Sequence, residues 1–131
     1  MSVPTNPFQH VDVRVTDLKV ARPFYETLLP ALGFTRDSSS SAWQCFDADG
    51  TAPTRPWFAF IEDPQHRPNA NRIAFWAASR AEVDRLAAVA VQAGARNMSG
   101  PKVMAEYGGG YYAAFFEDPC GNGLEICFLS D

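Results

Sequence analysis

The sequence has few of the residues that form metal or redox motifs, and it has no long apolar run. Its 131 residues include two histidines and three cysteines, Cys45, Cys120 and Cys127, and no two cysteines form a CxxC pair. An odd number of separated cysteines argues against a disulfide scaffold or a thiolate zinc site. No apolar window has the length of a membrane span and the first ten residues do not form a signal peptide, so we expect a cytoplasmic protein.

Clusters of basic residues are also missing. The 11 Lys and Arg residues are outnumbered by 15 Asp and Glu residues, which gives a net charge of −4. This balance predicts that neither nucleic acid nor a membrane is a partner. We expect a small-molecule ligand and a second copy of the chain, in a homodimer. The hydrophobic fraction of 47% is enough for one core, so residues 1–131 are expected to form a single domain.

The first half of the sequence reads as a strand followed by a helix. His10–Thr16 alternates valines with polar residues, as a half-buried strand does. Asp17 suits a helix N-cap, and Gly33 should end the helix. Because Pro23 and Pro30 lack a backbone donor, we expect the regular helix to start near residues 22–23 and to stop at Pro30.

The second half repeats this pattern. Arg72–Ala78 is a strand-like run, Ser79 and Glu82 form an S-x-x-E capping box, and Gly94 ends the helix. Shorter strand signals follow each helix, at Ala42–Phe46 and Trp57–Ile61 in the first half and at Tyr111–Phe116 and Leu124–Phe128 in the second. The sequence therefore predicts an α+β fold of two modules, about 7–62 and about 71–129, with two curved sheets around a cavity.

The opening HVDVRVTD and the closing GGYYAAFFEDPCGNGLEI resemble the vicinal oxygen chelate superfamily, which includes glyoxalases, bleomycin resistance proteins and extradiol dioxygenases. The most specific part is DP-x-GN-x-x-E at Asp118–Glu125, which follows an aromatic strand. The resemblance covers residues 8–128 and implies paired βαβββ modules. It also implies four strand positions that point into the cavity and often carry ligands to a divalent metal such as zinc, nickel, iron or manganese.

Carried over residue by residue, these positions fall on His10, near Phe58, on Arg72 and on Glu125. His10 and Glu125 are possible metal ligands or catalytic bases. Arginine keeps its proton and phenylalanine has no donor atom, so two of the four positions are not ligands. A stable site normally needs three side-chain ligands, and the third could come from His66 or from a partner subunit.

Arg72 and Glu125 admit more than one interpretation. The guanidinium could take the place of the metal, pair with Glu125 and bind an anionic group of a ligand. It could also form a plain internal ion pair or swing out to solvent. If both charges point inward they should be paired, because isolated buried charges are unfavourable.

Aromatic side chains could line the cavity, although most are expected in the core or at an interface. We select Phe58, Trp76, Tyr107 and Tyr112 as candidate ligand-binding residues. Tyr111 and Tyr112 cannot both face one side of a strand. The glycines after Tyr107 predict a lid or a ligand-contacting loop.

Two functions follow from the resemblance, and a third possibility stays open. The first is a metal-free protein that binds a small molecule, as the drug-resistance members do. The second is a metal-dependent lyase, isomerase or dioxygenase that uses His10 and Glu125. The third is an interaction module whose cavity is filled by its own side chains.

Overall fold

The computed structural model describes residues 6–51 and 54–130. Module one contains β1 (His10–Val15), α1 (Leu18–Leu32), β2 (Arg36–Asp37), β3 (Gln44–Asp47) and β4 (Trp57–Glu62). Module two contains β5 (Arg72–Trp76), α2 (Arg80–Ala93), β6 (Arg96–Val103), the 3-10 helix η1 (Ala105–Tyr107), β7 (Tyr112–Glu117) and β8 (Gly123–Phe128). No helix in these residues is long and apolar enough to cross a membrane.

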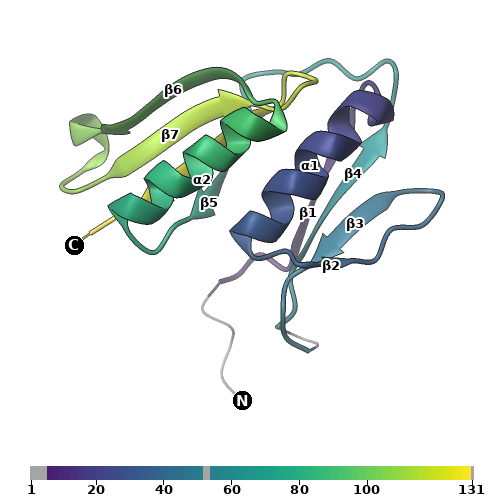
Figure 1. The fold of residues 1–131 in the computed structure, drawn as a ribbon, viewed down its shortest axis with the longest axis horizontal. Helices are drawn as coiled ribbons and strands as arrows, with labels where there is room; N and C mark the ends of the chain where they lie inside the picture. The colour runs from purple at the N-terminus through teal and green to yellow at the C-terminus, as the bar shows by residue number, and fades with distance from the viewer. Residues whose placement is uncertain (1–5, 52–53, 131) are drawn as a thin grey trace.

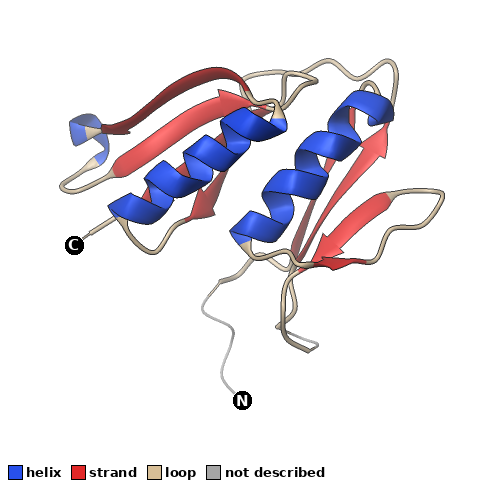
Figure 2. Cartoon of the chain, viewed as in Figure 1, coloured by secondary structure: helices blue, strands red, loops and turns tan. Residues whose placement is uncertain are grey.

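Each module forms a four-stranded mixed sheet. The strand orders are β1-β4-β3-β2 and β5-β8-β7-β6, with β1 parallel to β4 and β5 parallel to β8. The two helices lie side by side on one face of the sheets, as Figures 1 and 2 show. The α+β fold of two βαβββ modules is therefore confirmed, and the two sheets stay separate and open rather than closing into a barrel.

Helix α1 is longer than the prolines suggest. It begins at Leu18, where Asp17 accepts a hydrogen bond from the Lys19 N–H at 2.9 Å, and it runs through Pro23 and Pro30 to Leu32. The expectation of a start near residues 22–23 and an end at Pro30 is thus wrong. Each proline leaves unpaired the carbonyl four residues earlier, on Lys19 and on Glu26, and both of those residues are exposed to water.

The helix ends follow the sequence more closely. Gly33 has a φ of 111° and Gly94 a φ of 114°, the left-handed conformation that glycine tolerates at the end of a helix. Ser79 caps α2 by accepting a hydrogen bond from the Glu82 N–H at 3.1 Å. Strands β2 and β6 were not predicted individually, because the first has two residues and the second, RNMSGPKV, has no apolar alternation and an irregular register with β7.

One hydrophobic cluster joins the two modules. The Phe75 ring on β5 lies 5.8 Å from Phe58 on β4 and 6.4 Å from Phe34 after α1, measured between ring centroids. Tyr25 on α1 packs on Phe58 and Phe60 at 5.3 and 4.7 Å. The faces of both sheets that carry the helices therefore share their apolar contacts, and the opposite faces are left open.

The buried carboxylate of Asp118 ties the last turn to module one. Its oxygens accept hydrogen bonds from the Tyr25 O–H at 2.6 Å, from the Asn122 side chain at 2.9 Å, and from the backbone N–H groups of Cys120 and Asn122. The Asn122 amide also donates to the Arg14 carbonyl at 2.8 Å. Burial, followed by the nearby Asp118, raises the pKa of Tyr25 well above its usual value, so the phenol stays a donor.

Replacing Tyr25 with Phe removes one of these donors from a charge that has no access to water. We expect Tyr25→Phe to lower the free energy of unfolding by about 2 kcal/mol, since hydrogen bonds to buried charged groups contribute about that much. The matched control is Tyr112→Phe, whose hydroxyl donates to the exposed Asp84, and which should cost clearly less. Urea unfolding measures both, and equal losses would contradict a special role for Asp118.

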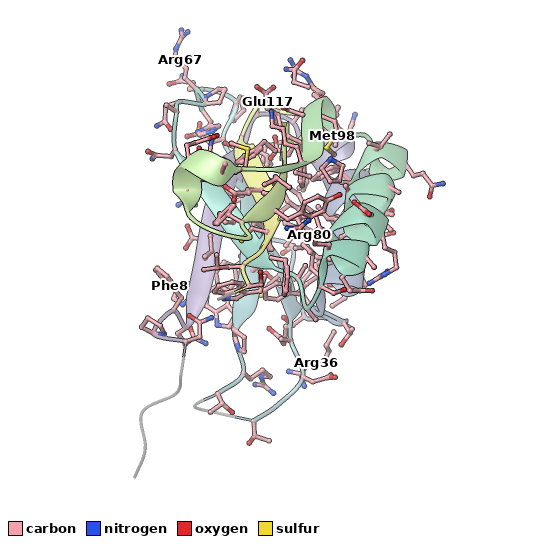
Figure 3. The ribbon with its side chains drawn as sticks, turned by 90° about the vertical axis from the view of Figure 1, so that its left-hand side faces the viewer. Phe8, Arg36, Arg67, Arg80, Met98 and Glu117 are labelled. Carbon is pink, nitrogen blue, oxygen red and sulfur yellow. The ribbon has the colours of Figure 1, made fainter. Side chains whose placement is uncertain are left out.

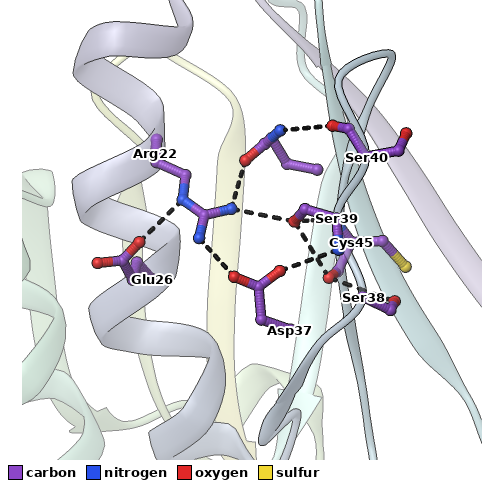
Figure 4. A network of polar contacts seen from close by, with 8 residues as sticks. Arg22, Glu26, Asp37, Ser38, Ser39, Ser40 and Cys45 are labelled. Carbon is purple, nitrogen blue, oxygen red and sulfur yellow. Dashed lines mark hydrogen bonds and ion pairs between the residues drawn. The ribbon is translucent and has the colours of Figure 1, made fainter.

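A second polar network fixes α1 to the loop after β2 (Figure 4). The Arg22 guanidinium donates to Glu26 at 2.8 Å, to Asp37 at 2.6 Å, to the Ser39 hydroxyl at 3.0 Å, and to Gln44. The Ser39 hydroxyl and then the Arg22 guanidinium lower the pKa of Asp37 to about 2. The ionised form of Asp37 is therefore favoured in the folded state.

This network predicts a pH dependence of stability. The pKa of Asp37 falls from 3.8 to about 2 on folding, so its contribution is complete above pH 4 and is lost as the pH falls towards 2. We expect Asp37→Asn to be less stable than the original protein at neutral pH, with the difference shrinking between pH 4 and pH 2. Urea unfolding across this range tests it, with the exposed Asp12→Asn as control, and a difference independent of pH would refute it.

Candidate functional site

Glu125 lies near the middle of β8 on the open face of module two, and only 3% of its surface is exposed. Oε1 accepts a hydrogen bond from the Arg72 Nε at 3.0 Å, and Oε2 accepts one from the Tyr111 hydroxyl. The ion pair considered from the sequence is therefore present. Both carboxylate oxygens are engaged by side chains of the same chain.

Arg72 is held on two sides and free on a third. Its Nε binds Glu125, and its guanidinium carbon lies 4.7 Å from the centroid of the Phe115 ring. About 44% of its side chain remains exposed. Its direct neighbour on β8 is Gly123, where even a Cβ atom would come within 2.9 Å of the Asn71 carbonyl.

A shallow cavity of about 200 Å³ opens beside this arginine. Its lining includes Asn71, Arg72, Asn97, Phe115 and Gly123. The cavity thus combines a fixed cation, amide groups, phenylalanine side chains and one carboxylate, that of Glu117, which accepts a hydrogen bond from the Asn97 amide at 3.0 Å. Such a set suits a small ligand with an anionic end.

Tyr111, rather than Tyr112, belongs to this site. The antiparallel register pairs Phe115 with Glu125 and Tyr112 with Phe128, so Tyr112 points to the helix side. There its hydroxyl donates to Asp84, and Arg80, labelled beside α2 in Figure 3, lies over its ring at 5.1 Å. Burial, with the hydrogen bond to Glu125 as the next cause, raises the pKa of Tyr111, so its hydroxyl stays protonated.

The prediction of Tyr112 as a ligand-binding residue therefore does not agree with the structure. The sequence already held the signal that separates the two tyrosines. In a hairpin whose turn is centred on Pro119–Gly121, residues 111, 115 and 125 share one face. The turn places Phe115 opposite Glu125, and side chains alternate along the strand, so Tyr111, four residues before Phe115, lies on the same face and Tyr112 does not.

Phe58 also differs from expectation, because it faces the helices. Only 1% of its surface is exposed, and it packs on Tyr25 and Phe75. The register shows why: β1 pairs His10 with Trp57, as β5 pairs Arg72 with Gly123. The position equivalent to Glu125 is therefore Ala59, one residue further along, and alanine has no metal-binding atom either.

His10 lies on the other module, away from Glu125. Its ring stacks on Trp57 at 3.8 Å between centroids, and its Nδ1 is bonded to the Gln9 side chain. In Figure 1 the linker enters β5 at the top, so Arg72 starts its strand at that end, whereas β1 starts at the opposite end. His66 bonds to Asn122 at 2.9 Å and does not supply a third ligand.

The remaining candidates lie on the open side with large exposed areas. Trp76 on β5 is 69% exposed. Tyr107 in η1 is about half exposed and meets Tyr111 and Phe115 edge-on at 5.2 and 6.4 Å. Tyr107 therefore covers one side of the aromatic wall next to Arg72, where the glycine-rich loop begins.

The donor set does not fit a metal ion within one chain. Residues 6–51 and 54–130 contain no group of three or more His, Cys, Asp or Glu side chains that could hold one. Glu125 has both oxygens bound, and Arg72, at another of the four positions carried over from the resemblance, cannot give up its proton to bind a metal. No chemical step is therefore assigned to a metal.

Comparison with known families decides the relationship. The model of the Glyoxalase/Bleomycin resistance protein/Dioxygenase superfamily matches residues 8–126. The chain belongs to this superfamily. No curated protein matches the sequence.

Solved structures of this superfamily share the fold. A glyoxalase/bleomycin resistance protein from Albidiferax ferrireducens is 24% identical with a TM-score of 0.76, over 95% of this chain and 100% of its own. The fosfomycin resistance protein FosX from Listeria monocytogenes is 19% identical with a TM-score of 0.69, over 97% and 96% of the two chains. A superfamily enzyme from Burkholderia phytofirmans is also 19% identical, with a TM-score of 0.67 over 91% and 95%. At these identities the likeness shows the fold alone.

Proposed function

We propose that this superfamily member is a cytoplasmic protein that binds a small anionic molecule without a metal, with Arg72 as the residue that binds the anion. The observation that carries the proposal is the saturation of Glu125. With one carboxylate oxygen on Arg72 and the other on Tyr111, the acidic position of the family serves to orient a cation.

The geometry of Arg72 favours an anionic group over a neutral one. Its Nε is used by Glu125, which leaves the two terminal nitrogens for a ligand. The Phe115 ring supports the guanidinium from one side, so little conformational freedom is lost when a ligand binds. Two N–H groups in a fixed plane match a carboxylate, phosphonate or phosphate group.

The ligand's remaining part would meet aromatic surface. Phe115 lines the cavity, Tyr107 meets the Phe115 ring edge-on, and Trp76 stands exposed at the end of β5, the strand that Arg72 begins. An apolar or aromatic body attached to the anionic group would bury these side chains. The proposed ligand class is therefore a small organic acid.

We include a homodimer in the proposal. An exposed Trp76 on an open sheet face, together with Phe8 at 74% exposure (Figure 3), is apolar surface of the kind that protein partners cover. A second copy that covers the open faces could set module one of one chain against module two of the other. That pairing would bring a His10 towards a Glu125 that a single chain keeps apart.

Binding of organic acids tests the role of Arg72. We expect benzoate or phenylphosphonate to bind the original protein, and Arg72→Met to weaken the binding by at least about tenfold through loss of a charge-assisted pair. Isothermal titration calorimetry measures the affinities. The control is Arg85→Met, which removes an exposed arginine paired with Glu82 on α2. Equal affinities in the two variants would refute the proposal.

Metal content separates the proposal from the metal-dependent alternative. We expect protein purified without chelator and without a nickel column to contain well under one metal per chain. Arg72→His removes the resident cation and adds an imidazole near Glu125, and in the proposed dimer His10 of the partner subunit supplies a third ligand, so this variant should gain zinc or nickel. Elemental analysis of both proteins gives the answer. Near-stoichiometric metal in the original protein would favour a metal-dependent lyase, isomerase or dioxygenase.

A further inference from the structure

The cavity beside Arg72 has a second charged wall, formed by Glu117 on β7 (Figure 3). Residues that pair directly across a sheet point to the same face. Gly123 of β8 pairs with Arg72 on one side and with Glu117 on the other. The two charged side chains therefore stand on either side of a residue without a side chain, and the cavity floor between them is backbone.

The cavity carries one negative charge that no cation balances. The charge of Arg72 is already paired with Glu125. Glu117 forms no ion pair within the part of the chain that the structure describes. Its direct neighbour on β6, Arg96, donates to the Pro119 carbonyl at 3.1 Å instead. A ligand that brings a cation as well as an anion would therefore balance both walls of the cavity.

Asn97 orients the carboxylate of Glu117. Its side-chain amide donates to Glu117 Oε1 at 3.0 Å, which leaves Oε2 without a hydrogen-bond partner among the described residues. Asn97 is also the one non-glycine residue of residues 6–51 and 54–130 with a positive φ, 56°, and it lies where the register of β6 with β7 shifts. Irregularities of this kind redirect a side chain out of the regular ladder. The Asn97 carbonyl oxygen is a further acceptor at this end of the cavity.

We infer that the cavity binds a zwitterion of the amino acid type, with its acidic group on Arg72 and its ammonium group on Glu117 and Asn97. The inference rests on the proposed function and narrows the ligand class from an organic acid to an amino acid. The Arg72 guanidinium lies over the Phe115 ring, and Glu117 is two residues further along β7 on the same face, about 7 Å away. A short amino acid can bond to both charged groups across this distance.

Three ligands of equal length test the inference. β-Alanine has both charges, propionate has only the acid, and β-alaninamide has only the ammonium group. We expect β-alanine to bind at least about tenfold more tightly than either of the others, because each of them loses one charge-assisted contact. Isothermal titration calorimetry at neutral pH measures the three affinities.

Variants assign the ammonium end. Glu117→Gln removes the charge and keeps the shape, so it should weaken the binding of β-alanine by at least about tenfold without weakening that of propionate. Asn97→Gly keeps the positive φ accessible and should act in the same selective way. The control is Glu82→Gln, which removes an exposed carboxylate of α2 and should change neither affinity. If a variant fails to fold, the ratio of the β-alanine and propionate affinities in the original protein still decides the question.

Equal affinities for β-alanine and propionate, or equal losses of both in Glu117→Gln, would overturn the inference. Binding of benzoate without binding of β-alanine would overturn it as well. If Arg72→Met still weakens the binding of propionate or benzoate in either case, the proposed anion site stands without the inference. If Arg72→Met leaves every affinity unchanged, the proposed function fails and the inference falls with it, so the two failures are distinguishable.

Discussion

The buried carboxylate of Asp118 is the interaction on which the arrangement of the two modules depends. A charge with no exposure to water requires donors on both oxygens, and here they come from α1 and from the last turn itself. The Asn122 amide continues the chain of bonds to the carbonyl of Arg14 on β1 and to His66 in the linker. The turn that precedes β8 is thereby fixed to module one.

This constraint explains why the most specific part of the sequence resemblance is a structural motif. Asp118 and Asn122 of the DP-x-GN turn make the contacts just described, and Gly121, with a φ of 93°, allows the turn. Because β8 starts directly afterwards, the turn sets the register with β5 and with β7. Glu125 occupies its place on the open face as a consequence.

What Glu125 does there depends on its neighbours. In an apolar strand a carboxylate needs a cation or hydrogen-bond donors, and a divalent metal, an arginine or a phenol can all provide them. Here Arg72 and Tyr111 do so together, which leaves the carboxylate no free oxygen. On our proposal, the same acidic position supports anion binding by Arg72 in place of coordination of a metal.

Local sequence signals were enough for the helices and for the repeat, but not for every side-chain direction. Asp17, Ser79, Gly33 and Gly94 act through contacts within a few residues, so their roles as caps could be read from the sequence. The effect of Pro23 and Pro30 on α1 was misjudged. Neither residue has a backbone N–H, but the helix continues through both because the carbonyl that each leaves without a partner is exposed to water. The errors at Phe58 and Tyr112 have a different origin, since a shift of one residue in register moves a side chain to the other face of a sheet.

The same register shows how the two modules of one repeat came to differ. His10 and Arg72 are equivalent, and their direct neighbours on the parallel strand are Trp57 and Gly123. Gly123 has no side chain, so Arg72 can extend past it to Glu125, one step along the same face. In module one Trp57 fills the corresponding space and stacks on the His10 ring, so His10 stays beside its direct neighbour on β4. The next residue of β4 on the same face is Ala59, whose side chain offers His10 no hydrogen-bond partner. One large residue in place of glycine, Trp57 where module two has Gly123, thus gives module one a set of packed aromatic rings. The corresponding space in module two holds the ion pair of Arg72 and Glu125.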